Sequence, residues 1–258
     1  DPAEVNKNVK VDVAVIGDAK ETLRSIIPKL KSKNHSSWVK KFRDLNKIEF
    51  KKVINKEYNK KEGGISMAEV IKSINENTDG NSILVTDVGQ HQMIACRYMN
   101  FNKTKSNITS GGLGTMGFAL PAALGAKIGD SKRQVVAIIG DGGFQMTIQE
   151  LGTIFQTSTS VKIVILNNEY LGMVRQWQQL FFDKRYASTE MTNPDFVTIS
   201  KGYYIEAKRV SKRKNLNSSI QEMLLHDGPY LLEVCVEKEE NVFPMIPSGS
   251  SVSDIRLE

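Results

Sequence analysis

Two short runs of β-branched and other apolar residues constrain the fold of this chain more than any other feature. Residues 135–139 lead into a Gly-Asp-Gly-Gly segment (140–143), and residues 161–166 lead into an Asn-Asn pair (167–168). Such runs are typical of strands that are buried on both faces of a parallel sheet. Similar runs alternate with segments of helical composition along the chain, which predicts an α/β fold with a doubly wound, mainly parallel sheet flanked by helices.

Polar residues follow both of these predicted strands. In open parallel sheets, ligands bind beyond the carboxyl ends of the strands, so Asp141 and Asn168 are expected to face one crevice. Gly142 and Gly143 would let a phosphate approach backbone N–H groups. One carboxylate and one amide oxygen suit Mg²⁺, which completes its octahedron with phosphate and water. The pattern indicates a metal-bridged diphosphate, although each motif alone is as consistent with a plain turn and a capping Asp.

Length, composition and charge limit the classes of protein to which the chain can belong. A chain of 258 residues with 40% hydrophobic content can hold one large α/β domain and part of another. No apolar stretch approaches the roughly 20 residues of a membrane span, so we expect a soluble, cytoplasmic protein. The net charge is +6, but Asp44, Glu49 and Glu57 interrupt the basic stretch 40–61, which favours a solvated helical connector over a nucleic-acid arm.

The chain is expected to divide into four parts. A predicted strand at 11–16 and helix at 21–30 are too little to fold alone, so residues 1–35 are interpreted as the tail of a preceding domain. Residues 36–63 form the basic helical connector. The main domain, residues 64–240, opens with a helix that Ser66 and Glu69 begin as a capping box. Residues 241–258 are expected to be a mobile tail.

Further elements of the main domain follow from the same patterns. The opening helix is expected to run to about Asn77. Strands are predicted at 82–86, 205–210 and 230–236, and helices at 93–99, 118–128, 146–155, 170–180 and 216–225. A glycine-rich loop at 111–117 lacks the GxGxxG spacing and the P-loop lysine, so it carries no nucleotide motif. Cys96 and Cys235 lack CxxC spacing and are interpreted as core thiols.

Three motifs make the chain recognisable. Val-Gly-Gln-His-Gln-Met (88–93), Ser-Gly-Gly-Leu-Gly-Thr-Met-Gly (110–117) and Asn-Asn-Glu-Tyr-Leu-Gly-Met-Val-Arg-Gln-Trp (167–177) resemble the catalytic (large) subunits of the acetolactate synthase (acetohydroxyacid synthase) family. The resemblance spans almost all of 64–247. It implies a thiamine diphosphate (ThDP) binding fold for residues 64–240, the end of a central FAD-binding-like domain for residues 1–35, and a tail over the cofactor for 241–258.

The resemblance also implies site residues. Asp141, Asn168 and the backbone carbonyl of Tyr170 would bind Mg²⁺. Met116 would hold ThDP in a bent conformation, Met173 would contact its aminopyrimidine, and Trp177 would shape the pocket of the second substrate; these three are the candidate catalytic residues. The candidate cofactor-binding residues are Val88, Gly89, Gln90, His91, Gly114, Met116, Asp141, Gly142, Gly143, Asn168, Gly172 and Met173.

Simpler interpretations stand beside these roles. Met116 and Met173 have the composition of ordinary core residues, and Met173 and Trp177 lie four apart, as on any amphipathic helix. His91 is also consistent with a hydrogen-bonded loop histidine. Gly143 departs from the family, many members of which have Ser at this position, so contacts to the diphosphate are expected to differ there.

The family reaction is the ThDP- and Mg²⁺-dependent decarboxylation of pyruvate and its condensation with a second 2-oxo acid, pyruvate or 2-oxobutyrate. It is a transferase reaction of branched-chain amino-acid biosynthesis. The resemblance implies FAD in the full-length enzyme, a homodimer through the ThDP site and a regulatory small subunit. The essential Glu of the family belongs to a pyrimidine-binding domain that this chain lacks, so the chain alone is expected to be inactive.

Two alternatives remain open. One is another ThDP and FAD enzyme, such as a pyruvate oxidase or glyoxylate carboligase; the motifs 90–93 and 172–177 argue against it. The other, for this chain alone, is a non-catalytic cofactor-binding module.

Overall fold

The structure, a computed structural model, describes residues 1–60, 62–247 and 249–258 and separates into two compact units, Asp1–Lys47 and Ile48–Glu258. The first unit holds the short helices η1 (Pro2–Glu4), α1 (Ala19–Ile26) and η2 (Ile27–Lys29), and most of α2 (Ser36–Glu49). The predicted strand at 11–16 is wrong. Val13 and Val15 are 79% and 62% exposed, and a strand without a neighbouring strand leaves its backbone groups unpaired.

The second unit contains the remaining elements, whose bounds follow in chain order. They are the π-helical turn η3 (Phe50–Ile54), α3 (Asn55–Tyr58), α4 (Met67–Thr78), β1 (Ile83–Thr86), α5 (Gln90–Tyr98), β2 (Asn107–Thr109), α6 (Ala119–Gly129), β3 (Val135–Gly140), α7 (Asp141–Met146), α8 (Glu150–Gln156), β4 (Val161–Asn167), α9 (Gly172–Phe181), α10 (Phe196–Gly202), β5 (Glu206–Val210), η4 (Arg213–Asn215), α11 (Leu216–Leu225) and β6 (Tyr230–Cys235).

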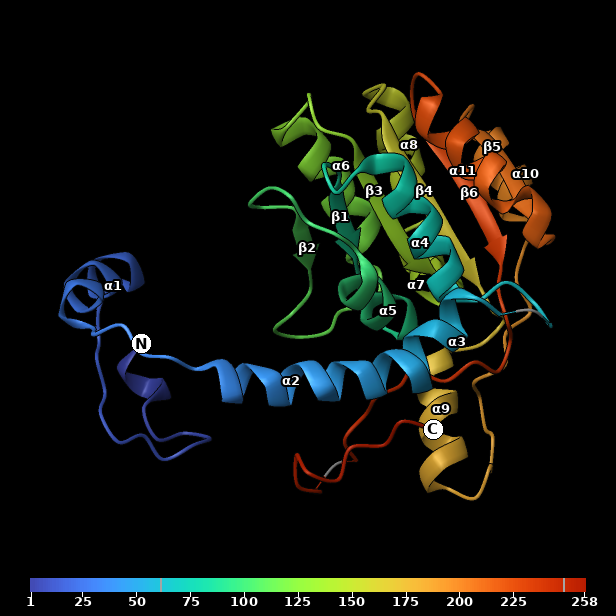
Figure 1. The fold of residues 1–258 in the computed structure, drawn as a ribbon. Coiled ribbons are helices and arrows are strands. Elements are labelled where there is room, and N and C mark those ends of the chain that lie inside the picture. Colours follow the sequence, from blue (N-terminus) through green and yellow to red (C-terminus); the bar gives the residue numbers. More distant parts are fainter. Residues whose placement is uncertain (61, 248) are drawn as a thin grey trace. The chain divides into compact units, whose positions relative to one another are not determined.

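The strands of this unit form one sheet in the order β2-β1-β3-β4-β6-β5 (Figure 1). Every described pair is parallel, so the predicted α/β class is confirmed and "mainly parallel" becomes all-parallel. The register pairs Ile139 with Ile165 and Gly140 with Leu166 across β3 and β4. Asp141 and Asn168 therefore follow neighbouring strands that end at the same edge, as the sequence predicts.

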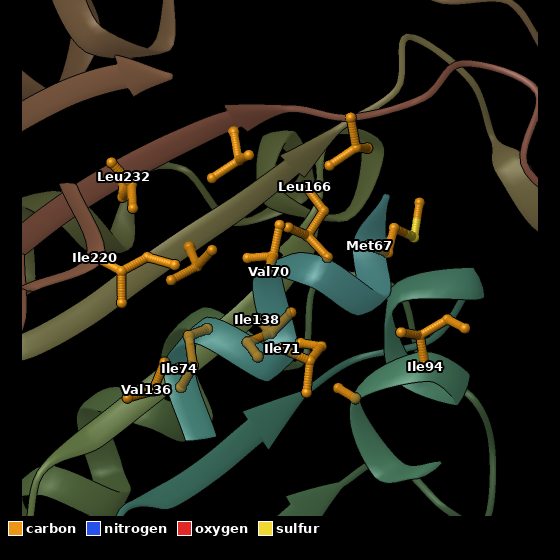
Figure 2. Close-up of a cluster of buried hydrophobic side chains, with 14 of the residues drawn as sticks. Met67, Val70, Ile71, Ile74, Ile94, Val136, Ile138, Leu166, Ile220 and Leu232 are labelled. Carbon is orange, nitrogen blue, oxygen red and sulfur yellow. The ribbon is translucent and has the colours of Figure 1, made fainter. Parts of the chain in front are cut away.

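Alternate residues of the strands enter two hydrophobic cores, one on each face of the sheet. Val136, Val164 and Leu232 pack with α4, α5 and α11 on one face, and Figure 2 shows the side chains of this cluster. Ala137 and Ile163 pack on the other face with α6, α7, α8 and α10. Because parallel strands need buried faces on both sides, this distribution explains the continuous apolar runs of the sequence.

Helix α4 begins as predicted. Ser66 Oγ accepts a hydrogen bond from Glu69 N at 3.1 Å, and Glu69 Oε2 accepts one from Ser66 N at 2.8 Å, which completes the capping box. The α4 residues Val70, Ile71 and Ile74 are fully buried. The helix is thus fixed at its start by polar contacts and along its length by packing.

Two further predictions need correction, and one strand was missed. The helix expected at 146–155 is divided, because α7 begins directly at Asp141 and α8 begins at Glu150. Strand β2 was not expected, since three residues at the sheet edge with exposed or half-buried side chains carry no apolar run. Cys96 and Cys235 are partly exposed and free, not core thiols. The division of the chain at residues 35, 63 and 240 stays a prediction.

Candidate functional site

Three neighbouring strands end in polar residues at one edge of the sheet. Asp87 follows β1, Asp141 follows β3 and Asn168 follows β4. The chain leaves β1 toward β2 on one side and returns to β3 on the other, so the order of strands reverses between β1 and β3. Such a reversal point is where open α/β sheets bind ligands.

A cavity of about 220 Å³, here called the central cavity, opens at this edge. Its lining residues come from the ends of β1, β3 and β4, from the starts of α4, α5, α7 and α9, and from the loop before α6. They are Met67, Val88, Gly89, Gln90, His91, Met116, Gly140, Asp141, Gly142, Gly143, Leu166, Asn168, Tyr170, Leu171, Gly172, Met173 and Val174. The structure therefore brings together all but two of the residues that the sequence analysis singled out.

The two exceptions are Gly114 and Trp177. Gly114 is not a lining residue but lies close to one, because a Cβ atom on Gly114 would be 3.4 Å from Val88 Cγ2. Trp177 is 37% exposed and lines a separate cavity with Val174, Gln178, Phe182 and Arg185. Val174 lines both cavities, so Trp177 lies next to the central cavity without facing it.

The Asp141 carboxylate is 1% exposed and accepts three hydrogen bonds. Gly142 N donates to Oδ1 at 3.0 Å, while Glu169 N and Asn193 Nδ2 donate to Oδ2 at 2.9 and 2.7 Å. Burial raises the pKa of Asp141 above its usual value, and these three donors oppose that rise. No Lys, Arg or His among the described residues forms an ion pair with it, so a cation would find an uncompensated carboxylate.

Two further oxygens at this edge have the chemistry of Mg²⁺ ligands. Asn168 is 5% exposed, and within the described ranges its Oδ1 accepts only a long hydrogen bond, 3.3 Å, from Tyr170 N. Among the described backbone amides, none donates to the Tyr170 carbonyl. The nearby Glu169 has a positive φ of 55°, which turns the chain sharply between these two residues. A carboxylate, an amide oxygen and a carbonyl are hard oxygen ligands that fit Mg²⁺. Phosphate and water oxygens would complete the octahedron of the metal.

Asp87 was missed as a site residue, although the sequence places it beside the motif 88–93. It is fully buried; His91 Nε2 lies 2.5 Å from its Oδ1, and Gly117 N donates to its Oδ2 at 3.0 Å. A Cβ atom on Gly143 would lie 2.0 Å from Asp87 Oδ2. The glycine therefore leaves room for this orientation of Asp87, which in turn holds the His91 ring at the cavity wall.

Gln90 presents an unpaired acceptor. Its Nε2 donates to Gln176 Oε1 at 2.9 Å and to the Glu240 carbonyl at 2.8 Å, which fixes the orientation of the amide. Its Oε1 is buried and has no partner among the described residues. An unpaired buried oxygen favours a hydrogen-bond donor from a ligand or its bound water over an anionic diphosphate oxygen.

Comparison with known proteins assigns the chain to a family. A family model described as the thiamine pyrophosphate enzyme, C-terminal TPP binding domain, matches residues 87–234, more than half of the chain. The chain belongs to this family of enzymes, and thiamine pyrophosphate is another name for ThDP. The match begins at Asp87 and spans both Asp141 and Asn168.

Within the family, the chain resembles one enzyme in particular. It is 39% identical to the acetolactate synthase isozyme 2 large subunit of Escherichia coli (strain K12), over 99% of this chain and 45% of that protein. It is 40% identical to the acetolactate synthase large subunit of Corynebacterium glutamicum, over 99% of this chain and 42% of that protein. The resemblance to the catalytic subunit of acetolactate synthase is thereby confirmed, and the chain spans less than half the length of these relatives.

A solved structure supports the fold. The thiamine diphosphate-dependent 4-hydroxybenzoylformate decarboxylase of Rhodococcus jostii RHA1 matches with a TM-score of 0.64 and 26% identity, over 70% of this chain and 34% of that one. In the described part of the chain, none of the helices has the length and apolar character needed to cross a membrane.

Proposed function

We propose that the central cavity binds Mg²⁺ and the diphosphate of ThDP, as the C-terminal half of an acetolactate synthase active site. The observation that carries the proposal is that Asp141, Asn168 and Tyr170 line one cavity, while none of the described backbone amides donates to the Tyr170 carbonyl. The family match supports ThDP as the ligand, because the matched region is a TPP-binding domain.

Each wall of the cavity has a proposed task. Asp141, Asn168 and the Tyr170 carbonyl bind the metal, and the backbone at Gly142 and Gly143 lies near the diphosphate. Val88, Gly89, His91 and Gly172 also line the cavity and are proposed to contact the diphosphate end of the cofactor. The unpaired Oε1 of Gln90 suits a water molecule on hydrated Mg²⁺, which keeps several waters when it binds phosphates.

The apolar residues of the cavity position the organic part of the cofactor and exclude water. Met116 and Met173 line the cavity, and Gly114 supports its wall behind Val88. When bound, ThDP supplies the electron sink that makes decarboxylation of a 2-oxo acid possible. Trp177, in the adjoining cavity, is proposed to contact the second 2-oxo acid.

The activity of the whole protein is also a proposal. It decarboxylates pyruvate and joins the product to a second pyruvate or to 2-oxobutyrate, in branched-chain amino-acid biosynthesis. We propose that it also binds FAD, forms a homodimer through the ThDP site and associates with a regulatory small subunit. The support is about 40% identity to acetolactate synthase subunits along nearly all of this chain. A cytoplasmic location stays a prediction.

Calorimetry tests the proposed site directly. ThDP is titrated into the chain with and without Mg²⁺, and the titration is repeated with Asp141→Ala. We expect weak binding by the wild type that requires the metal, and no detectable binding by the variant, because Asp141 supplies the only carboxylate of the proposed ligand set. Equal binding by both proteins would contradict the ligand assignment.

Product analysis tests the reaction. The chain alone, given pyruvate, ThDP and Mg²⁺, is expected to form no acetolactate, and formation of acetolactate would contradict its predicted inactivity. The full-length protein is expected to form acetolactate. Hydrogen peroxide from pyruvate would indicate a pyruvate oxidase, and tartronate semialdehyde from glyoxylate would indicate a glyoxylate carboligase.

A further inference from the structure

We infer that Asn193 is a positioning residue that aims the Asp141 carboxylate at the metal, as the first member of a hydrogen-bonded chain that continues through Asn167 and Glu233 to Arg209. This inference rests on the proposed function, because it assigns a role toward the same Mg²⁺ site. Asn193 comes from the segment before α10 and belongs to none of the three recognised motifs.

The hydrogen bonds of Asp141 identify the oxygen that is left for a cation. Oδ2 accepts from both Asn193 Nδ2 and Glu169 N, at 2.7 and 2.9 Å. Among the described residues, only Gly142 N donates to Oδ1, at 3.0 Å. Since each carboxylate oxygen offers about two lone-pair positions, Oδ2 is saturated and Oδ1 retains one. Asn193 thus helps to turn the unoccupied lone pair of Oδ1 toward the metal.

The orientation of the Asn193 amide is itself determined by its neighbours. Gln145 Nε2 donates to Asn193 Oδ1 at 2.9 Å. Asn193 Nδ2 uses its two hydrogens for Asp141 Oδ2 and, at 3.0 Å, for Asn167 Oδ1. An inverted amide would place oxygen against the Asp141 and Asn167 oxygens and nitrogen against the Gln145 donor. Only the observed orientation satisfies all three partners.

The series of hydrogen bonds includes a buried charge, the Glu233 carboxylate, before it reaches Arg209. Asn167 Nδ2 donates to Glu233 Oε1 at 2.8 Å, and Arg209 Nε donates to Glu233 Oε2 at 2.7 Å. Glu233 is 1% exposed and lies on β6, between β4 and β5. An ionised acceptor makes the hydrogen bond from Asn167 charge-assisted. The sheet register therefore fixes Asn167, and Asn167 together with Gln145 fixes Asn193.

The simpler interpretation is that Asn193 only ties its loop to the sheet. A loop anchor affects the stability of the folded chain, whereas a positioning residue also affects the affinity of the folded chain for the metal. Residues that orient metal ligands typically contribute about 10- to 100-fold to metal affinity. Metal affinity therefore separates the two interpretations, and it can be measured without any turnover.

The experiment uses the full chain with ThDP present and Mn²⁺ as the probe, with free Mn²⁺ measured by electron paramagnetic resonance. Asn193→Ala removes the donor to Asp141. Gln145→Ala keeps Asn193 and removes the hydrogen bond that orients its amide, together with the longer hydrogen bond, 3.4 Å, from Gln145 Nε2 to the Asp141 carbonyl. Thr192→Ala is the matched control, because Thr192 is exposed, lies next to Asn193 and forms no hydrogen bond among the described residues. Asp141→Ala reports on the metal site itself, and circular dichroism checks the fold.

We expect Mn²⁺ binding to weaken about tenfold or more in Asn193→Ala, by a smaller factor in Gln145→Ala, and not at all in Thr192→Ala. Wild-type affinity in folded Asn193→Ala, together with loss of binding in Asp141→Ala, overturns the inference and leaves the proposed function intact. Equal affinities in wild type and Asp141→Ala overturn both. If Asn193→Ala does not fold, Gln145→Ala decides, and wild-type affinity in that variant overturns the inference.

Discussion

Two cavities lie at the carboxyl edge of the same sheet, and they differ in how their polar groups are satisfied. The central cavity has mostly apolar side chains and glycines, with Asp141 and Asn168 at its rim. A larger cavity of about 420 Å³, here called the lateral cavity, lies at the ends of β4, β5 and β6. Its lining residues are Asn167, Glu169, Glu190, Met191, Thr192, Asn193, Pro194, Arg209, Glu233 and Cys235.

Most charges of the lateral cavity are already paired. Arg209 contacts Glu233 at 2.7 Å, and Lys238 contacts Glu169 and Glu190 at 3.2 and 2.9 Å. The Asp141 carboxylate in the central cavity has no such partner among the described residues. The comparison teaches that the smaller cavity holds the oxygens left without a cationic partner, and the proposed function rests on those oxygens and not on cavity size. Four predictions test how far the difference extends.

The largest effect on stability is expected at Gly172, a lining residue of the central cavity, because an added Cβ atom has no room there. A Cβ atom at Gly172 would lie 2.1 Å from Gln90 Oε1 and 2.8 Å from Asn168 Nδ2. Gly172→Ala must displace buried polar groups, so we expect it to lower the free energy of unfolding by ~2–3 kcal/mol, measured in urea.

Gly125→Ala is the control for this prediction, because Gly125 lies inside α6 with nothing near its added Cβ atom. We expect it to stabilise the chain by up to about 1 kcal/mol, since Ala favours a helix over Gly. Equal effects of the two substitutions on the free energy of unfolding would mean that the central cavity accommodates a side chain at Gly172.

The second prediction concerns the buried ion pair of the lateral cavity. Arg209→Ala leaves Glu233 in the sheet without its cationic partner. We expect a loss of ~2 kcal/mol in the free energy of unfolding, below the value for a fully buried pair because Arg209 is partly exposed. Lys208, on the same strand as Arg209, forms an exposed pair with Glu222 of α11, and Lys208→Ala is the control. A loss no greater than that of the control would show that the lateral charges do not stabilise the fold.

The third prediction concerns Glu57, a carboxyl group outside both cavities whose titration would contribute to the pH dependence of unfolding. Burial raises the pKa of Glu57 to about 7, with a rise from Glu240 and an opposing hydrogen bond from the Tyr98 hydroxyl. The folded chain therefore holds this proton more tightly than the unfolded chain does. The stabilising effect is complete below about pH 4.5, decreases as the pH rises to about 7, and is absent above that.

Glu57→Gln should therefore flatten the pH dependence of unfolding between pH 4.5 and 7, by about 1–2 kcal/mol after allowance for the partial exposure of the carboxyl group. Glu222→Gln is the opposite control. The Lys208 hydrogen bond lowers the pKa of Glu222, so Glu222 stabilises the fold above its usual pKa and loses this effect in acid. An unchanged slope in Glu57→Gln would place the titrating group elsewhere, with Asp141 and Glu240 as the candidates, because burial raises the pKa of both.

The smallest effect is expected at the rim of the lateral cavity. Lys238→Met breaks the contacts with Glu169 and Glu190, whose side chains are 56% and 67% exposed. Because solvent screens such pairs, the free energy of unfolding should change by about 0.5 kcal/mol or less. A loss as large as that of Arg209→Ala would remove the distinction between rim and buried charges.

The sequence predicted the part of the site that local patterns determine. Apolar runs located β3 and β4, and the polar residues after them located Asp141 and Asn168. The capping box located the start of α4. In each case the residues that decide the structure are neighbours in the chain, so composition and spacing sufficed.

The sequence did not reveal what depends on distant contacts. Asn193 reaches Asp141 from a loop 52 residues away, and no spacing rule connects them. Helix α7 begins within a glycine-rich segment of low helix propensity. The Phe144 and Phe196 rings pack with their centroids 5.4 Å apart, and this packing outweighs the low propensity. Asp87 was given no role among the predicted site residues, and only its burial beside Gly117 and Gly143 shows that it supports the cavity wall.

The order of the strands has a consequence for how the chain reaches this structure. Strand β6 lies between β4 and β5, and β5 pairs only with β6 among the described strands. During synthesis, β5 therefore emerges from the ribosome before the one strand that can bind it. The β4 edge, including Asn167, stays open until β6 follows. Folding of this half of the sheet should thus be late and cooperative, with Glu233 among the last groups to be buried.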